Sequence, residues 1–293
     1  MTSSMTSESG LGGPMGGGLT RRERQRLATY DEIVVVSRAL LARGEEVSLR
    51  AVAGEMGMTP PALYRYVDGH AELLALLGRA IFVDVVEHMA AARDRFPATD
   101  PAGQIVAAAV AFRSWALREP AEFRLVFASA ESVADGEETT CCPTIPGVTT
   151  SLEGHESFGV FFAEIFTRLW QQVHFPVPGA EQLASELGAN VVAALAAPPA
   201  EKVEVVGALP TVGPGMLWIF QRAWVRLYGT VILEVFGHIH PALADSGALF
   251  AATVRDIGRD LGLEADWERL GPILRELLAH DTGAEAGGAA RED

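Results

Sequence analysis

Apolar residues recur at helical spacing along most of the chain, and no stretch has the strict alternation of a half-buried strand. Glycines and prolines stand at the junctions of the periodic stretches. The pattern predicts helices at 22–43, 102–117, 120–129, 157–173, 180–196, 214–239, 245–262 and 266–280, and a long one over 70–89 that breaks near Pro97. The chain is therefore predicted to be all-α.

The first predicted helix should brace its neighbours with one face. That face is expected to consist of Leu27, Tyr30, Val34, Ser37 and Leu41, and Gly44 follows as a stop.

Residues 48–66, SLRAVAGEMGMTPPALYRY, have the pattern of two short helices joined by a sharp turn. Ser48 is suited to cap the first helix, and Gly57 can take the left-handed conformation that ends it. Thr59 can cap the second helix, which should begin at Pro60 because the first helical turn does not need the amide that proline lacks. This arrangement predicts a helix-turn-helix.

The second short helix has an inward and an outward side. Leu63 and Val67, four residues apart, can face inward, which leaves an outward surface suited to the DNA major groove: Pro61, Ala62, Tyr64 and Arg65. Small groups can contact thymine methyls, a tyrosine hydroxyl can reach phosphate, and arginine can pair with guanine. The alternative is an ordinary helical hairpin in which the glycine and prolines only mark the turns.

The run LRAVAGEMGMTPPALYRYVDGHAELL resembles the DNA-binding domain of the TetR family of bacterial transcriptional regulators, and the resemblance extends back to the helix that begins near Arg22. The leucine–tyrosine pair and bulky residue of that family's recognition helix are here Leu63, Tyr64 and Tyr66. The family's phosphate-binding lysine is replaced by His70, so that contact should be weaker or depend on pH. The DNA-binding residues predicted from the motif and the resemblance are Arg22, Arg50, Thr59, Pro60, Pro61, Ala62, Tyr64, Arg65, Tyr66 and His70.

A second segment, RAWVRLYGTVILEVFGHIHP, resembles the ligand-binding domain of a TetR subgroup that carries a Trp-x-x-x-His-Gly signature. Here the signature residues are Trp224, Tyr228 and Gly229, with tyrosine in place of histidine. Family members dimerise through two C-terminal helices per subunit. The resemblance therefore predicts a homodimer with these three residues at the partner contact.

Aromatic residues at helical spacing are candidates for the wall of an apolar ligand cavity. They are Trp115, Phe123, Phe127, Phe162, Phe166 and Trp170. The alternative is that they belong to an ordinary core.

The net charge of −15 is unevenly distributed. Residues 19–80 contain nine arginines and eight acidic residues, whereas residues 81–293 account for nearly all of the negative charge. Since an acidic body repels phosphate, any DNA contact should be confined to the N-terminal part.

The stretch 129–157 lacks periodicity and is predicted to be a loop or lid. Its adjacent cysteines, Cys141 and Cys142, could sense oxidants or bind a metal with His155. This is the alternative, since the prediction is that the protein has no metal and no cofactor. His238 and His240 are interpreted as the frayed end of a helix. The motifs of serine hydrolases, zinc proteases and phosphate-binding loops are missing from the sequence, so an enzyme is not expected.

We expect tails at 1–18 and 281–293, a DNA-binding domain at 19–68, and a ligand-binding and dimerisation domain at 69–280. The predicted function is that of a cytoplasmic homodimeric repressor that is released from a palindromic double-stranded operator by a small apolar ligand, without a membrane partner. The alternative is a helical small-molecule-binding or thiol-redox-sensing protein without DNA-binding activity.

Overall fold

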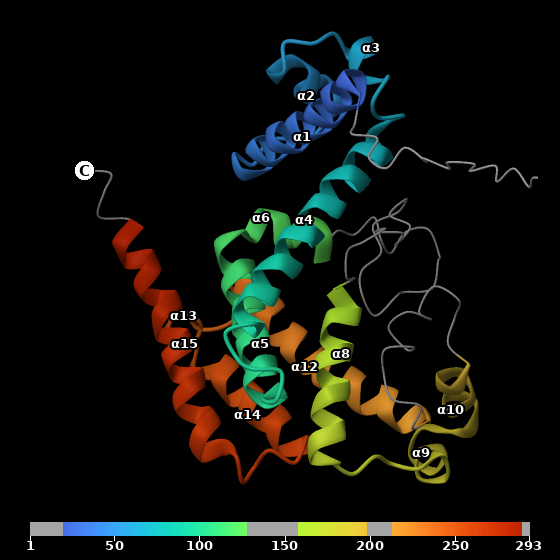
Figure 1. Cartoon of the computed structure of the whole chain (residues 1–293), viewed down its shortest axis with the longest axis vertical. Helices are drawn as coiled ribbons and strands as arrows, with labels where there is room; N and C mark the ends of the chain where they lie inside the picture. Colours follow the sequence, from blue (N-terminus) through green and yellow to red (C-terminus); the bar gives the residue numbers. More distant parts are fainter. Residues whose placement is uncertain (1–19, 128–157, 198–212, 289–293) are drawn as a thin grey trace, which may run out of the picture.

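The computed structural model describes residues 20–127, 158–197 and 213–288, with side chains as far as residue 280. Every element in these ranges is a helix, which confirms the all-α prediction. Figure 1 shows a small group of helices, called the head below, that α4 joins to a larger helical body. Among the described helices, none combines the length and the apolar composition that a membrane span requires. The segment with Cys141, Cys142 and His155 lies outside the described residues.

The head contains α1 (Arg21–Ala42), α2 (Leu49–Glu55) and α3 (Pro60–Leu63). The Ser48 side chain accepts from the amide of Ala51 and so caps α2, as the sequence predicts. Gly57 has φ +63°, and α3 begins at Pro60 as predicted. The Thr59 backbone is extended like that of a cap, but its side chain makes no capping hydrogen bond.

The buried side of α1 agrees only in part with the predicted one. Ser37 is fully buried as predicted, and Tyr30, Val34 and Leu41 are half-buried and pack against the core. Ile33 and Leu40 are 0% and 1% exposed, whereas Leu27, predicted to face inward, is 48% exposed. The stripe is rotated because α1 packs between α2 and α4 and also reaches α6, and these contacts begin only near Thr29. Thr29 can be buried because its hydroxyl donates to the Gln25 carbonyl, a compensation that an apolar pattern does not reveal.

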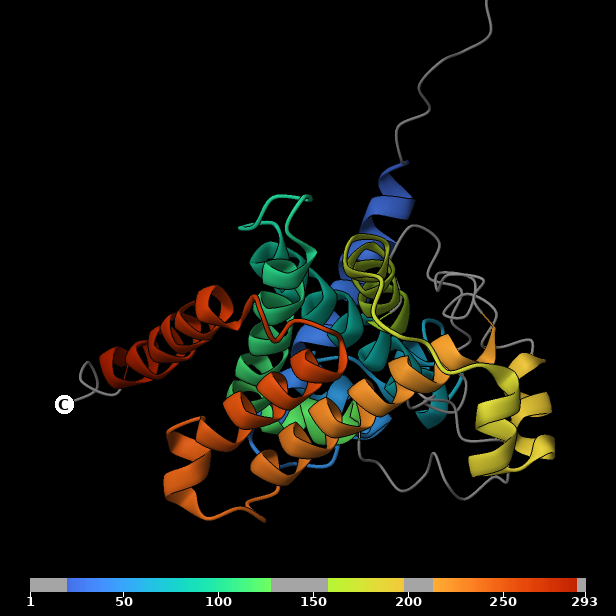
Figure 2. The same cartoon turned by 90° about the horizontal axis from the view of Figure 1, so that it is seen from below.

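The body is arranged around α5 (Pro101–Arg118), which packs against α4 (His70–Arg93), α8 (Phe158–Val173), α12 (Pro214–Val235) and α15 (Trp267–Gly288). Figure 2 shows α5 with α15 on one side and α8 on the other. Nearly every residue from the start of α5 to Ala116 is buried. Its many alanines permit this close approach from several sides.

The remaining helices are α6 (Pro120–Phe127), α9 (Ala180–Leu187), α10 (Ala189–Ala196), α13 (Pro241–Asp245) and α14 (Ala248–Asp260). The single helix predicted at 180–196 is wrong, because α9 and α10 occupy this range. The helix predicted at 245–262 is present as α14 but is shorter at both ends, and α13 precedes it. Gly188 (φ +93°) separates α9 from α10, and Gly247 in the left-handed region separates α13 from α14.

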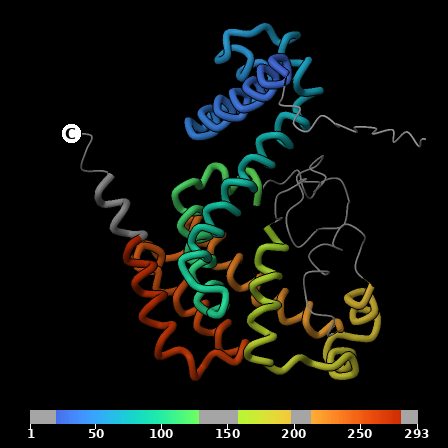
Figure 3. Tube along the Cα trace, in the orientation of Figure 1, coloured from blue at the N-terminus to red at the C-terminus, as the bar shows by residue number. Residues whose placement is uncertain are grey.

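Two helix ends also differ from the prediction. Helix α12 ends at Val235 rather than near 239, since Gly237 has φ +68°. Helix α15 continues to Gly288 rather than ending at 280, as Ala284–Glu285–Ala286 favours helix and the first glycine pair comes only at 287–288. Figure 3 shows the red part of α15 along the side of the body.

Candidate nucleic-acid interface and ligand pocket

The second helix of the helix-turn-helix presents one face to the core and the other to solvent. The helix ends at Leu63, earlier than predicted, and Val67 lies four residues beyond its end. Leu63 and Val67 are 0% and 1% exposed, so they anchor this segment in the head. Pro61, Tyr64 and Arg65 are exposed, and Tyr64 retains 54% of its accessible surface. The outward face is therefore open to a macromolecule as large as duplex DNA.

Several other predicted DNA contacts also lie on the surface. Thr59 and Pro60 are exposed, and Ala62 is half-buried. Arg22, Arg50 and Arg65 are exposed and form no ion pair with another described residue. Their charges are thus available to phosphates.

Tyr66 has a supporting position rather than an open one. Its ring is half-buried and meets the ring of Tyr30 edge-on at 5.7 Å between centroids. The Arg26 guanidinium donates to the Tyr30 hydroxyl over 3.0 Å. Tyr66 therefore joins α1 to the end of the recognition helix, and its predicted DNA contact would be limited to the exposed part of the ring.

His70, in the place of the family's lysine, already has a partner. Its Nε2 lies 2.9 Å from the carbonyl oxygen of Val47, and a carbonyl can only accept, so Nε2 donates. The neutral ring then has only the acceptor Nδ1 left, which cannot donate to phosphate. A phosphate bond from this position needs a doubly protonated ring or loss of the Val47 contact.

An ion cluster joins the head to the body. Arg38 of α1 lies 2.5 Å from Asp84 of α4 and 3.3 Å from Glu122 of α6. Burial raises the pKa of Glu122 above its usual range, an effect that the charge of Arg38 only partly offsets. The cluster connects three helices that belong to different parts of the molecule.

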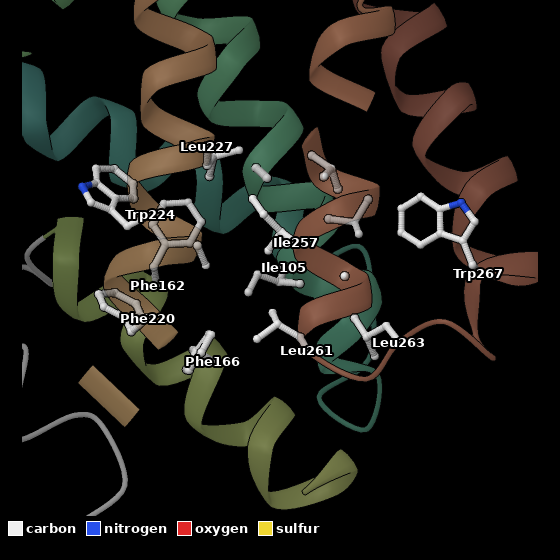
Figure 4. Close-up of a pocket in the computed structure, with 15 residues that line it drawn as sticks. Ile105, Phe162, Phe166, Phe220, Trp224, Leu227, Ile257, Leu261, Leu263 and Trp267 are labelled. Atoms are coloured by element: carbon white, nitrogen blue, oxygen red, sulfur yellow. The ribbon is translucent and has the colours of Figure 1, made fainter. Parts of the chain in front are cut away.

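The body contains an apolar pocket between α5, α8, α12 and α14 (Figure 4). Its cavity volume is about 60 Å³, and no charged residue lines it. The lining residues are Ile105, Val106, Ala109, Phe162, Phe166, Phe220, Ala223, Trp224, Leu227, Val254, Ile257, Gly258, Leu261, Leu263 and Trp267. Such a wall suits an uncharged apolar group and would exclude an ion.

The predicted ligand residues are divided between the pocket and the core. Phe162 and Phe166 line the pocket. Trp115 and Phe127 do not, because they lie in a buried aromatic cluster with Phe123. Trp170 faces His174 instead, at 5.4 Å between ring centroids. The pocket residues on α12 and α14 were not predicted to line the cavity, since apolar stripes on these helices look like ordinary core.

Trp224 and Tyr228 of α12, which are predicted to contact a dimer partner, are half-buried and pack within the body. Their rings stack at 5.4 Å with 11° between planes, and Trp224 also lines the pocket. The Tyr228 hydroxyl donates to the carbonyl of Phe127 on α6. Both rings are directed at α6 and α8 because the aromatic cluster there offers burial that an outer surface would not. Gly229 has open space beside it, with no atom within 4 Å of an added Cβ.

A buried ion pair was also missed. Arg113 of α5 donates to Glu234 of α12 over 2.6 Å, and the side chains are 2% and 0% exposed. Arg113 also donates to the carbonyl of Ala244 over 2.6 Å. The available signal was a single charge within an otherwise apolar stretch of each helix, which requires a buried partner.

His238 and His240 follow the end of α12, and His240 caps α13 by accepting from the amide of Ala242. Within the described ranges, no cluster of three or more histidine, cysteine, aspartate or glutamate side chains could hold a metal ion.

Comparison with known proteins identifies similar transcriptional regulators and a similar solved structure. The chain is 39% identical over 110 residues to the HTH-type transcriptional regulators Mb1846 of Mycobacterium bovis and Rv1816 of Mycobacterium tuberculosis. The match covers 37% of this chain and 47% of each relative, so it spans about half of their length. The crystal structure of SCO4313, a protein described provisionally as regulatory, is 26% identical with a TM-score of 0.51 over 81% of this chain and 98% of that one.

The C-terminal part matches a family as well. The model described as tetracyclin repressor-like, C-terminal domain, matches residues 105–257. This range includes most of α5, all of α6, α8 and α12, and most of the pocket wall. The match spans more than half of the chain, and the head has the helix-turn-helix described above. The chain belongs to the TetR family.

Proposed function

We propose that this chain is a DNA-binding transcriptional regulator that acts as a homodimeric repressor and leaves its operator when a small apolar ligand binds the body. The observation that carries the proposal is the continuity of α4. This helix begins in the head, where His70 contacts Val47, and continues into the body, where Met89 is fully buried. A shift of the body would therefore rotate the head.

The exposed side of the helix-turn-helix supports DNA binding. Tyr64 and Arg65 project from it, and Arg22 and Arg50 lie on the same part of the molecule with no competing carboxylate among the described residues. Relatives named as HTH-type transcriptional regulators support the same role. A head of this size reads one short half-site, so a palindromic operator read by a dimer is the expected target.

The dimer surface is proposed on the outer side of α12 and α14 rather than at Trp224 and Tyr228. Four apolar residues are exposed there: Val225, Leu233, Phe236 and Leu249, at 63%, 44%, 38% and 38%. The hydroxyls of Thr230 and Thr253 lie 3.1 Å apart and join the two helices, so the surface is a preformed unit. Exposed apolar groups gathered on two adjacent helices are typical of a subunit interface.

The ligand is proposed to be neutral and apolar. A cavity of about 60 Å³ is smaller than an engineered cavity of about 150 Å³ that accepts benzene. A ligand must therefore push parts of the wall aside. This displacement would provide the movement that α4 and the Arg38 cluster transmit to the head.

Operator binding and ligand binding can be tested on one preparation. Fluorescence anisotropy with the DNA upstream of the protein's own gene should give saturable binding, and a ligand found by thermal-shift screening should weaken it by about 5- to 150-fold. Ligand affinity must fall by the same factor when operator is present. Binding of ligand without binding of any upstream DNA would favour a helical small-molecule-binding protein instead. Equal ligand affinities with and without operator would refute the coupling.

A further inference from the structure

One wall of the apolar pocket is formed by the turn that follows α14. Leu261, Leu263 and Trp267 line the cavity from this turn and from the start of α15. All three lie beyond residue 257, where the match to the family's C-terminal domain ends. The rest of the wall comes from the helices α5, α8, α12 and α14.

Trp267 is placed between the cavity and solvent. It lines the pocket but is only half-buried, and in Figure 4 its ring is directed from α15 toward α14. A Cβ at Gly258 of α14 would lie 3.1 Å from the Cζ3 atom of the indole. The ring can approach α14 this closely because residue 258 has no side chain.

An ion cluster holds this wall against the start of α5. The Arg269 guanidinium donates to both carboxylate oxygens of Asp100, over 2.7 and 2.9 Å, and also to Asp266 over 2.6 and 3.0 Å. Asp100 itself caps α5 by accepting from the amide of Gly103. Burial acts to raise the pKa of Asp100, but the hydrogen bonds from Arg269 and Gly103 outweigh it, so the pKa lies below its usual value and the cluster stays charged near neutral pH.

The turn is also the part of the wall that can move with the least disruption. Residues 261–266 are outside any helix, and Gly262 has φ +71°. Displacing them breaks the two backbone bonds that end α14, from the amides of Leu261 and Leu263 to the carbonyls of Ile257 and Gly258, and exposes these two leucines. Moving α5 or α8 would disrupt a whole helix and expose many more buried side chains.

We propose that residues 261–270 form a gate over the apolar pocket, that Trp267 is the side chain that an arriving ligand displaces, and that Arg269 holds the gate closed through Asp100. The inference rests on the proposed function, since it assumes that the pocket receives an apolar ligand. A compact neutral molecule with a flat ring is the class that fits, because it can take over the contacts of the displaced indole.

The gate can be tested with N-phenyl-1-naphthylamine, a neutral dye that fluoresces in apolar surroundings, in stopped-flow measurements on the full chain. Arg269→Ala should raise the association rate about fivefold, as expected for loss of a part-exposed bidentate ion pair. Trp267→Ala should raise it at least as much, and Trp267→Phe by a smaller factor. The matched control is Arg275→Ala, which removes an exposed arginine of α15 that forms no ion pair with another described residue.

The outcomes separate the gate from the pocket. Saturable binding with the same rates in the parent, the Arg269 variant and both Trp267 variants would overturn the gate and leave the pocket intact. No saturable binding by any form would remove the pocket's proposed role, and the gate with it. Ala109→Leu, which fills the cavity, should weaken dye binding; undiminished affinity in that variant would place the dye elsewhere and contradict both. Arg269 is at the surface, so its variant remains informative if Trp267→Ala fails to fold.

Discussion

The buried pair of Arg113 and Glu234 permits a prediction about the free energy of unfolding. The structure indicates the direction, the size and the pH dependence of its change when the pair is broken. Arg113→Met removes the cation that pairs with Glu234 and also a donor to the Ala244 carbonyl. Glu234 is then left as a carboxylate whose side chain is 0% exposed and whose Oε1 already accepts no hydrogen bond from another described residue. Removing one partner of such a pair typically costs about 3–5 kcal/mol of unfolding free energy. We expect a loss in this range near neutral pH.

The pH dependence has a definite sign. Burial raises the pKa of Glu234 in the parent, although the hydrogen bond and charge of Arg113 act to lower it. Without Arg113 the pKa should be higher still. A carboxyl whose pKa is raised in the folded state stabilises the fold below its unfolded pKa, and this contribution is lost as the pH rises through the folded pKa. The cost of Arg113→Met should therefore be largest near pH 8 and shrink toward pH 5.

Urea denaturation followed by circular dichroism at these two pH values provides the measurement. Arg113→Met/Glu234→Leu should recover most of the loss, because an apolar pair of similar volume has no charge to desolvate. Arg259→Met, at an exposed pair with Asp256, is the control and should change the free energy of unfolding by at most about 1 kcal/mol. A loss from Arg113→Met that is independent of pH, or a double variant no more stable than the single one, would refute the reasoning.

Three further predictions concern DNA, assembly and coupling. Tyr64→Phe should weaken binding to all operators about equally, whereas Arg65→Ala should relax the preference for one base pair. Anisotropy titrations with single-base operator variants measure both effects. The roles would be contradicted if both variants kept the affinity and the base preference of the parent. Leu233→Asp should shift the protein from dimer to monomer in light scattering. The control Val191→Asp, at a similarly exposed position on α10, should leave the dimer intact. If both variants remain dimers, the α12 surface is not the dimer interface. Arg38→Ala should reduce the ligand-induced change in operator affinity by a factor of about 2 to 30, and an unchanged ratio of affinities with and without ligand would remove the Arg38 cluster from the coupling.

The helix-turn-helix was predictable because its signals are local. A serine cap, a glycine with positive φ and a proline at the first helical position each act within a few residues, and the structure has all three where the sequence places them. The rotation of α1 was not predictable in the same way. Its buried face depends on packing against α2, α4 and α6, and the burial of Thr29 depends on a hydroxyl bond that hydrophobicity does not measure.

The pocket was predictable only in its chemistry. An aromatic and aliphatic wall was expected, and Phe162 and Phe166 are part of it. The rest of the wall brings together residues more than a hundred positions apart, such as Ile105 and Trp267. Periodicity marks each of their helices as apolar on one side, but it carries no information about which apolar sides leave a space between them.

Trp224 belongs both to a local sequence signature and to the wall of the pocket. As part of a signature in the sequence it was assigned to a partner contact, but in the structure it lies between the pocket and the aromatic cluster and stacks on Tyr228. The hydroxyl of Tyr228 is bonded to the end of α6, and Glu122 near the start of α6 pairs with Arg38 of α1. A displaced Trp224 therefore has a continuous path of contacts to the head that does not use α4. Because α1 packs against both α2 and α4, this path and the α4 path end on the same helix, and a movement of the pocket wall would reach the helix-turn-helix from two sides.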